Sequence, residues 1–183
     1  MKLRKGLSCV AFGFLFTLVS VNLNFSEQST LDLFPDFVGW LLFLLAYNQL
    51  LRYTAEKPVL KWLPLPMLLY SGAVWLMDLN GSPLDIGLLS VIPLFIQLFY
   101  MYTLFGCLER LAADHAPDMA PRIRTLRNLN LGLAILLALF SYLAYAMQSD
   151  LLTLPVFIGA FIALAVAVYT CVTLFKLRSR VPE

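Results

Sequence analysis

The chain has 183 residues and a formal net charge of +2, with 61% apolar and 13% charged residues. Soluble domains are about half apolar and about a quarter charged, and a domain of this size cannot bury so much apolar surface in its own core. The composition therefore excludes an ordinary soluble domain, and the small net charge argues against a nucleic-acid partner. Lipid is the solvent that fits, so we expect a single all-α membrane domain over residues 1–183.

Six apolar stretches are long enough to cross a bilayer as helices, which takes about 20 residues with a range of roughly 17–25. Uninterrupted runs of this length lack the alternation of a membrane β-strand. The first stretch follows a basic start, as in a signal peptide, but no small-residue cleavage site follows it. The predicted spans are residues 6–23, 35–51, 62–79, 84–108, 129–148 and 153–175.

All 13 lysines and arginines fall before the first span, after the last one, or in two of the five connections. Basic residues are retained on the cytoplasmic side during insertion. Six spans place these four segments on one face, which predicts that both termini are cytoplasmic. The segments contain Lys2, Arg4 and Lys5; Arg52, Lys57 and Lys61; Arg110, Arg122, Arg124 and Arg127; and Lys176, Arg178 and Arg180.

The short outer connections group the spans into three helical hairpins. The second helix of each hairpin opens with Pro-x-x-x-Gly, which places glycines at Gly39, Gly87 and Gly159. Proline suits a first helical turn, and glycine lets helices approach closely. Shared insertion physics or an ancient triplication would each explain the pattern. Gly159, Ala163 and Ala167 form a small-residue face, either for internal packing or for a second copy.

Six of the 11 acidic residues lie on the predicted outer side, where no basic residue accompanies them. Asp36, Asp85 and Asp150 lie near helix N-termini, where the helix dipole stabilises a carboxylate. Asp78 follows the third span and has no such explanation. The four aspartates are therefore either mostly helix-end residues or an outer cation site. Trp40 and Trp75 are predicted at the outer boundary and Trp62 at the inner one, because tryptophan favours membrane interfaces.

The predicted span over residues 84–108 contains a proline and a polar side chain. Pro93 removes a backbone hydrogen bond from the helix, and Gln97 lies one turn further along. Gln97 is interpreted either as a partner in an interhelical hydrogen bond or as part of a small-solute path beside the bend. Charged residues do not occur near the middle of any predicted span, which argues against a proton relay.

Residues that carry chemistry are sparse. Cys9, Cys107 and Cys171 lie in apolar runs without metal-ligand spacing, and the single histidine, His115, lies in the predicted 109–128 connection. The sequence contains no nucleotide-binding, zinc or nucleophile motif. We therefore expect no catalytic, cofactor-binding or metal site, and a protein that is not an enzyme. The arginine-rich segment before the fifth span would attract anionic lipid headgroups, although control of topology also explains it.

The N-terminal 55 residues carry a resemblance. Leu31–Trp40 reads Leu-Asp-Leu-Phe-Pro-Asp-Phe-Val-Gly-Trp. It resembles the first hairpin, with its Leu-Pro-Asp-Phe-Ile-Gly-Tyr stretch, of a group of small multi-pass membrane proteins of Gram-positive, Clostridium-like bacteria. Phe34 and Trp40 replace the Leu and Tyr of that stretch. The resemblance implies a bacterial plasma-membrane protein and assigns no activity.

Two functions follow as hypotheses. The first is a non-enzymatic accessory or scaffold component that acts with a membrane-protein partner or as a homo-oligomer. The second is a facilitator or channel for a small solute or cation, with its path near Pro93 and Gln97.

Overall fold

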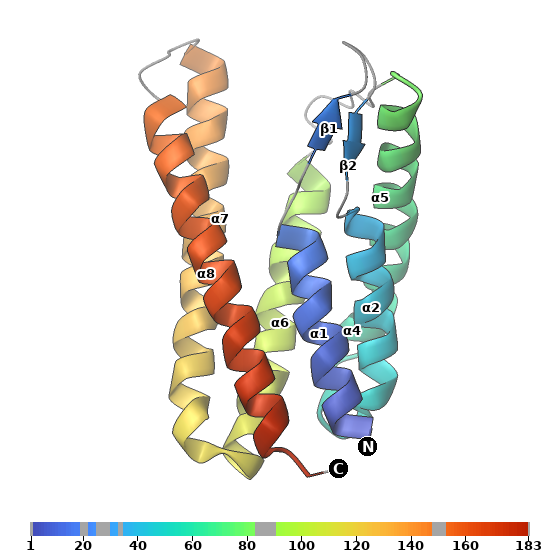
Figure 1. Cartoon of the computed structure of the whole chain (residues 1–183), viewed down its shortest axis with the longest axis vertical. Helices are drawn as coiled ribbons and strands as arrows, with labels where there is room; N and C mark the ends of the chain where they lie inside the picture. Colours follow the sequence, from blue (N-terminus) through green and yellow to red (C-terminus); the bar gives the residue numbers. More distant parts are fainter. Residues whose placement is uncertain are drawn as a thin grey trace.

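The computed structural model is a bundle of long helices with a two-stranded β-ribbon at one end (Figure 1). It describes residues 2–18, 22–24, 30–32, 35–82, 91–147 and 153–182. The predominantly helical fold confirms the predicted class. The long helices are α1 (Lys2–Leu18), α2 (Asp36–Gln49), α5 (Pro64–Leu79), α6 (Val91–His115), α7 (Ala120–Met147) and α8 (Thr153–Arg180). The short helices are α3 (Leu51–Thr54), α4 (Val59–Trp62) and the 3₁₀ helix η2 (Pro117–Met119).

Four helical segments of the described chain are long and apolar enough to cross a membrane. They are Val59–Leu79, Ile92–His115, Pro117–Phe140 and Leu154–Arg180. Helices α1 and α2 have 17 and 14 residues and are shorter than these segments. The structure thus supports a membrane protein, while six spans stay a prediction.

Three helix ends lie beyond the predicted span boundaries. Helix α6 continues to His115 and α7 begins at Ala120, so most of the predicted 109–128 connection is helical. Helix α8 likewise runs to Arg180, past the predicted end at residue 175. Hydropathy detects only the apolar part of a helix, whereas backbone hydrogen bonding continues into the charged turns beyond it.

The β-ribbon has no counterpart among the predicted elements. Strand β1 (Asn22–Asn24) pairs antiparallel with β2 (Thr30–Asp32), with Leu23 opposite Leu31. The predicted first span includes residues 22 and 23, and that boundary is wrong. The Nε1 of Trp75 in α5 donates a hydrogen bond to the carbonyl oxygen of Asp32 at 3.2 Å. This bond ties the ribbon to the end of α5.

Helix α1 packs between α2 and α8. Helix α2 also contacts α5, and α7 contacts both α6 and α8. The N-terminus and the C-terminus lie at the same end of the bundle, opposite the β-ribbon (Figure 1). The three-hairpin grouping stays a prediction, because the contacts of α5 within the described chain are mainly with α2.

The core is aromatic where α1, α2 and α6 meet. Trp40 and Phe43 of α2 pack edge-on against each other at 5.6 Å between ring centroids, and Trp40 meets Tyr100 of α6 at 5.2 Å. Phe14 of α1 contacts Phe105 of α6 at 5.0 Å. Trp40 is only 1% exposed, so aromatic packing holds its ring inside the bundle. Its predicted depth at the outer boundary stays a prediction.

Candidate functional site

The four basic segments of the sequence lie together at the end of the bundle that carries both termini. The Nε of Arg4 donates to the carbonyl oxygen of Val181 at 2.9 Å, which joins the two ends of the chain. Arg110 of α6 pairs with Glu56 at 2.8 Å, between the α3–α4 segment and α6. Arg180 of α8 pairs with Asp118 of η2. We call this end of the bundle the basic end.

A pocket of about 600 Å³ opens at the basic end between α4, α6 and α7. One wall is apolar and comes from Val59 at the start of α4 and from Phe99 and Tyr102 of α6. The lining also carries charged side chains, including Lys57 and Arg124. We call this cavity the α4–α6–α7 pocket. It joins apolar helix surface to the charged end of the bundle.

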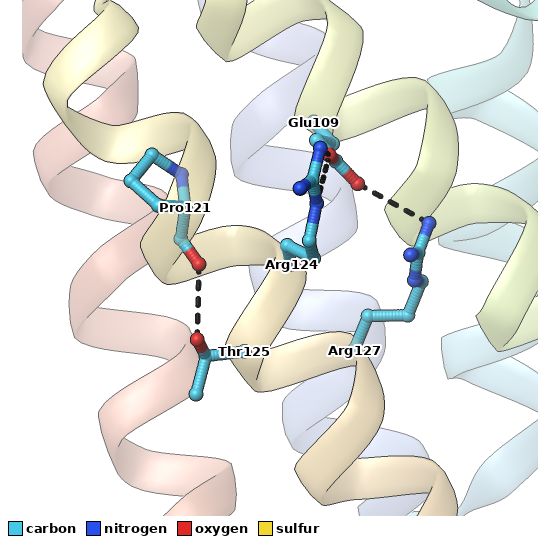
Figure 2. Close-up of polar contacts among 5 residues, drawn as sticks. All are labelled: Glu109, Pro121, Arg124, Thr125 and Arg127. Atoms are coloured by element: carbon cyan, nitrogen blue, oxygen red, sulfur yellow. Dashed lines mark hydrogen bonds and ion pairs between the residues drawn. The ribbon is translucent and has the colours of Figure 1, made fainter.

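An ion-pair cluster borders this pocket. From α7, Arg124 and Arg127 converge on the Glu109 carboxylate of α6 (Figure 2). The Nη2 of Arg124 lies 2.6 Å from Oε1, and the Nη1 of Arg127 lies 3.2 Å from Oε2. The side chains of Glu109 and Arg127 are 15% and 18% exposed, whereas that of Arg124 is 65% exposed. The cluster therefore has a sheltered part and an exposed part.

Arg127 is the deepest cation of the cluster. Its guanidinium carbon lies 4.8 Å from the centre of the Tyr102 ring, which is within the range of a cation–π interaction. Its Nε is buried, and no acceptor in the described part of the chain reaches it. On the same helix, the Thr125 hydroxyl donates to the Pro121 carbonyl oxygen, away from the cluster (Figure 2). The Nε–H group of Arg127 therefore has no hydrogen-bond acceptor in the described chain, although the residue lines the α4–α6–α7 pocket.

Comparisons with known protein families, with curated proteins and with solved structures found no match for this chain. The site therefore has to be interpreted from its own geometry.

The predicted outer aspartates are brought together only in part. Asp36 and Asp78 line one cavity of about 190 Å³, and Asp32 of β2, absent from the predicted set, lines it too. Asp85 and Asp150 lie outside the described residues. Within the described chain, no group of three or more His, Cys, Asp or Glu residues is placed to hold a metal ion. The cavity is a polar recess beside Trp75.

The predicted path at Gln97 coincides with a small cavity. It measures about 50 Å³ and is lined mainly by apolar side chains, among them Phe14, Met101 and Phe105. A space of this size holds about one or two water molecules. Pro93 is the third residue of α6 as described, and residues 83–90 lie outside the described chain, so the expected bend stays a prediction.

The small residues lie at close helix contacts. A Cβ on Gly39 would lie 2.5 Å from the Thr17 Cγ2 and 2.9 Å from the Gly13 carbonyl oxygen, so α1 and α2 nearly touch there. A Cβ on Gly159 would lie 2.6 Å from Leu137 Cδ2, which places this glycine against α7. Ala167 is buried and Ala163 is half-buried. Gly87 lies outside the described residues.

Glu109 and Tyr102 are absent from the residues that the sequence singles out. A usable signal is present, because Arg124 and Arg127 are three residues apart and therefore share one helix face. Glu109 lies on the adjoining helix α6, about two turns before its end, and Asp114 and Asp118 lie between it and the arginines in the sequence. This pattern points to Glu109 only if α6 is known to pack against α7. The prediction treated residues 109–128 as a connection, so it did not place these residues on two neighbouring helices.

Proposed function

We propose that this chain is a six-span, non-enzymatic accessory or scaffold protein of the bacterial plasma membrane, with both termini in the cytoplasm. The basic end supports this orientation, because positive charge is retained on the cytoplasmic side. The bacterial location rests on the resemblance of the first 55 residues.

The observation that carries the accessory role is the broad apolar surface of α7 and α8. In their most apolar stretches, 11% and 17% of the residues are buried inside the bundle. Phe157 and Phe161 of α8 are 59% and 60% exposed, and their rings contact each other at 4.9 Å. Helices that carry such side chains offer a packing surface to another membrane protein as well as to lipid.

The facilitator hypothesis has weaker support. A path for solute past Gln97 needs a continuous polar cavity, and the space beside this residue is about 50 Å³ with mainly apolar walls. We therefore favour the accessory role.

Orientation can be tested with single cysteines in a variant that lacks the native ones. Asn80→Cys lies beyond α5, at the end of the bundle opposite the termini, and Ser179→Cys lies in the last turn of α8; both positions are exposed. We expect a membrane-impermeant maleimide to label position 80 in intact cells and position 179 only after permeabilisation. The reverse pattern, or labelling of both positions in intact cells, would contradict the proposed topology.

The partner surface can be tested with a photo-crosslinking residue at Phe161 in native membranes. We expect one discrete protein adduct there and none at Phe14, which is 1% exposed and serves as the matched aromatic control. Crosslinking at Phe161 to lipid alone would contradict the accessory role.

A further inference from the structure

We propose that the α4–α6–α7 pocket binds the phosphate headgroup of an anionic membrane lipid, with Lys57 and Arg124 as the binding cations. This inference rests on the proposed membrane location and names a ligand for the basic end. Three features of the pocket carry it: the charge of its walls, the exposure of its cations and the apolar wall beside them.

The charge of the lining favours an anion. Four cations, Lys57, Arg110, Arg124 and Arg127, line the pocket together with a single carboxylate, Glu109. Arg110 is occupied by Glu56 outside the pocket, and Arg127 is held by Glu109. No carboxylate in the described chain pairs with Lys57. The cluster and Lys57 together therefore keep an excess of positive charge.

The cations differ in their freedom to move. The side chain of Arg124 is largely exposed and shares its carboxylate with Arg127, so it can turn toward a phosphate without leaving Glu109 unpaired. Arginine binds phosphate through two parallel N–H···O bonds, and lysine acts as a point charge. Arg127 also lines the pocket, but its side chain is sheltered and its guanidinium is held over the Tyr102 ring.

The apolar wall distinguishes a lipid from a soluble phosphate. Phe99 and Tyr102 are 55% and 44% exposed and continue the pocket toward the apolar part of α6. On α4, the Lys61 ammonium lies 5.0 Å from the centre of the Trp62 ring, an arrangement typical of a membrane interface. A lipid would place its headgroup among the cations and its acyl chain along this wall. Basic pockets between membrane helices on the cytoplasmic side bind lipid headgroups in this way.

The test is a titration of the purified full-length chain in neutral detergent, with the thermal unfolding midpoint as the readout. The three probes are a short-chain phosphatidylglycerol, the phosphatidylcholine of the same chain length, and glycerol phosphate. We expect saturable stabilisation by phosphatidylglycerol, with the other two probes at least about tenfold weaker. Equal stabilisation by phosphatidylcholine, or by glycerol phosphate, would refute an anionic-lipid site.

Charge variants distinguish lipid binding in the pocket from nonspecific attraction of the lipid to the positive charge of the basic end. Each cation beside an anionic headgroup strengthens binding by about fivefold, so Lys57→Gln with Arg124→Gln should weaken it by about 25-fold. The matched control, Arg122→Gln with Arg178→Gln, removes the same charge from exposed positions that do not line the pocket. An equal loss in the control would show that bulk electrostatics, and no specific pocket, attracts the lipid.

A filling variant tests the cavity without changing its charge. Ala113 of α6 is exposed and lines the pocket, so Ala113→Trp should block the cavity without disturbing the core. We expect an unchanged unfolding midpoint without lipid and a loss of phosphatidylglycerol binding of at least about tenfold. Undiminished binding would overturn the pocket assignment. These titrations do not depend on membrane orientation, so their failure is distinct from a failure of the proposed topology.

Discussion

Gly39→Ala should destabilise the protein, because it places a methyl group where α1 and α2 nearly touch. The new Cβ would lie 2.5 Å from Thr17 Cγ2 and 2.9 Å from the Gly13 carbonyl oxygen. Both distances are far below the usual carbon contact of about 3.5–4.0 Å, so the helices must separate by roughly 1 Å. Such overpacking costs about 1–3 kcal/mol. We expect a loss near the middle of that range, because one of the two obstacles is backbone.

The measurement is reversible unfolding of the purified chain in mixed micelles, compared between matched alanine variants. Gly132→Ala is the control, since nothing lies within 4 Å of the position that its new methyl group would take, and we expect only the gain in helix propensity, a stabilisation of about 0.5–1 kcal/mol. Thr17→Ser should restore part of the loss in the double variant. It removes the Cγ2 atom and keeps the hydroxyl that donates to the Gly13 carbonyl oxygen at 3.0 Å. Wild-type stability of Gly39→Ala would refute the close contact.

Three further substitutions test polar contacts by the same unfolding assay. Glu109→Gln should lower the free energy of unfolding by about 1–3 kcal/mol, because it leaves a sheltered guanidinium unpaired. Its control is Glu56→Gln, which should lower it by less than about 1 kcal/mol, because the Glu56 side chain is 74% exposed. Equal losses in the two variants would contradict the sheltered cluster. Asn130→Leu should cost about 0.6–1.7 kcal/mol, since its Nδ2 donates to the Thr170 hydroxyl across α7 and α8 at 3.2 Å, and the exposed Asn128→Leu is its control. Tyr53→Phe should cost about 1 kcal/mol through its lost 2.9 Å hydrogen bond to Asp114; no change would show that the bond is not formed in solution.

The sequence predicted the helical class and the clustering of charge because both depend on local composition. An apolar run long enough to span a bilayer has to satisfy its backbone internally, which leaves only a helix. The helix ends were harder to predict, because polarity marks where a membrane ends and not where a helix ends. Helix α7 begins at Ala120, well before its apolar run, and the exposed turn that contains Arg124 pairs with a neighbouring helix.

The candidate site could not be predicted from local composition, because its parts come from distant segments. Glu109 meets Arg124 only when α6 and α7 run antiparallel with one particular offset. The same limit applies to Trp40. Its sequence position suggested the depth of an interface, but it did not indicate that Phe43 of α2 and Tyr100 of α6 pack against the ring, which is 1% exposed. A residue's depth in the bundle depends on neighbours that hydropathy does not identify.

The single carboxylate that lines the pocket explains how one cluster can serve both stability and binding. A guanidinium as sheltered as that of Arg127 requires a counter-ion, since an unpaired buried charge is costly. A second carboxylate would give each arginine a counter-ion of its own, but it would cancel the positive charge that an anionic headgroup needs. Glu109→Gln should therefore separate the two roles. It should lower the stability of the lipid-free protein and at the same time strengthen phosphatidylglycerol binding, because both arginines become available to the phosphate. If stability and lipid affinity fell together, the cluster would act on the pocket only by holding its shape.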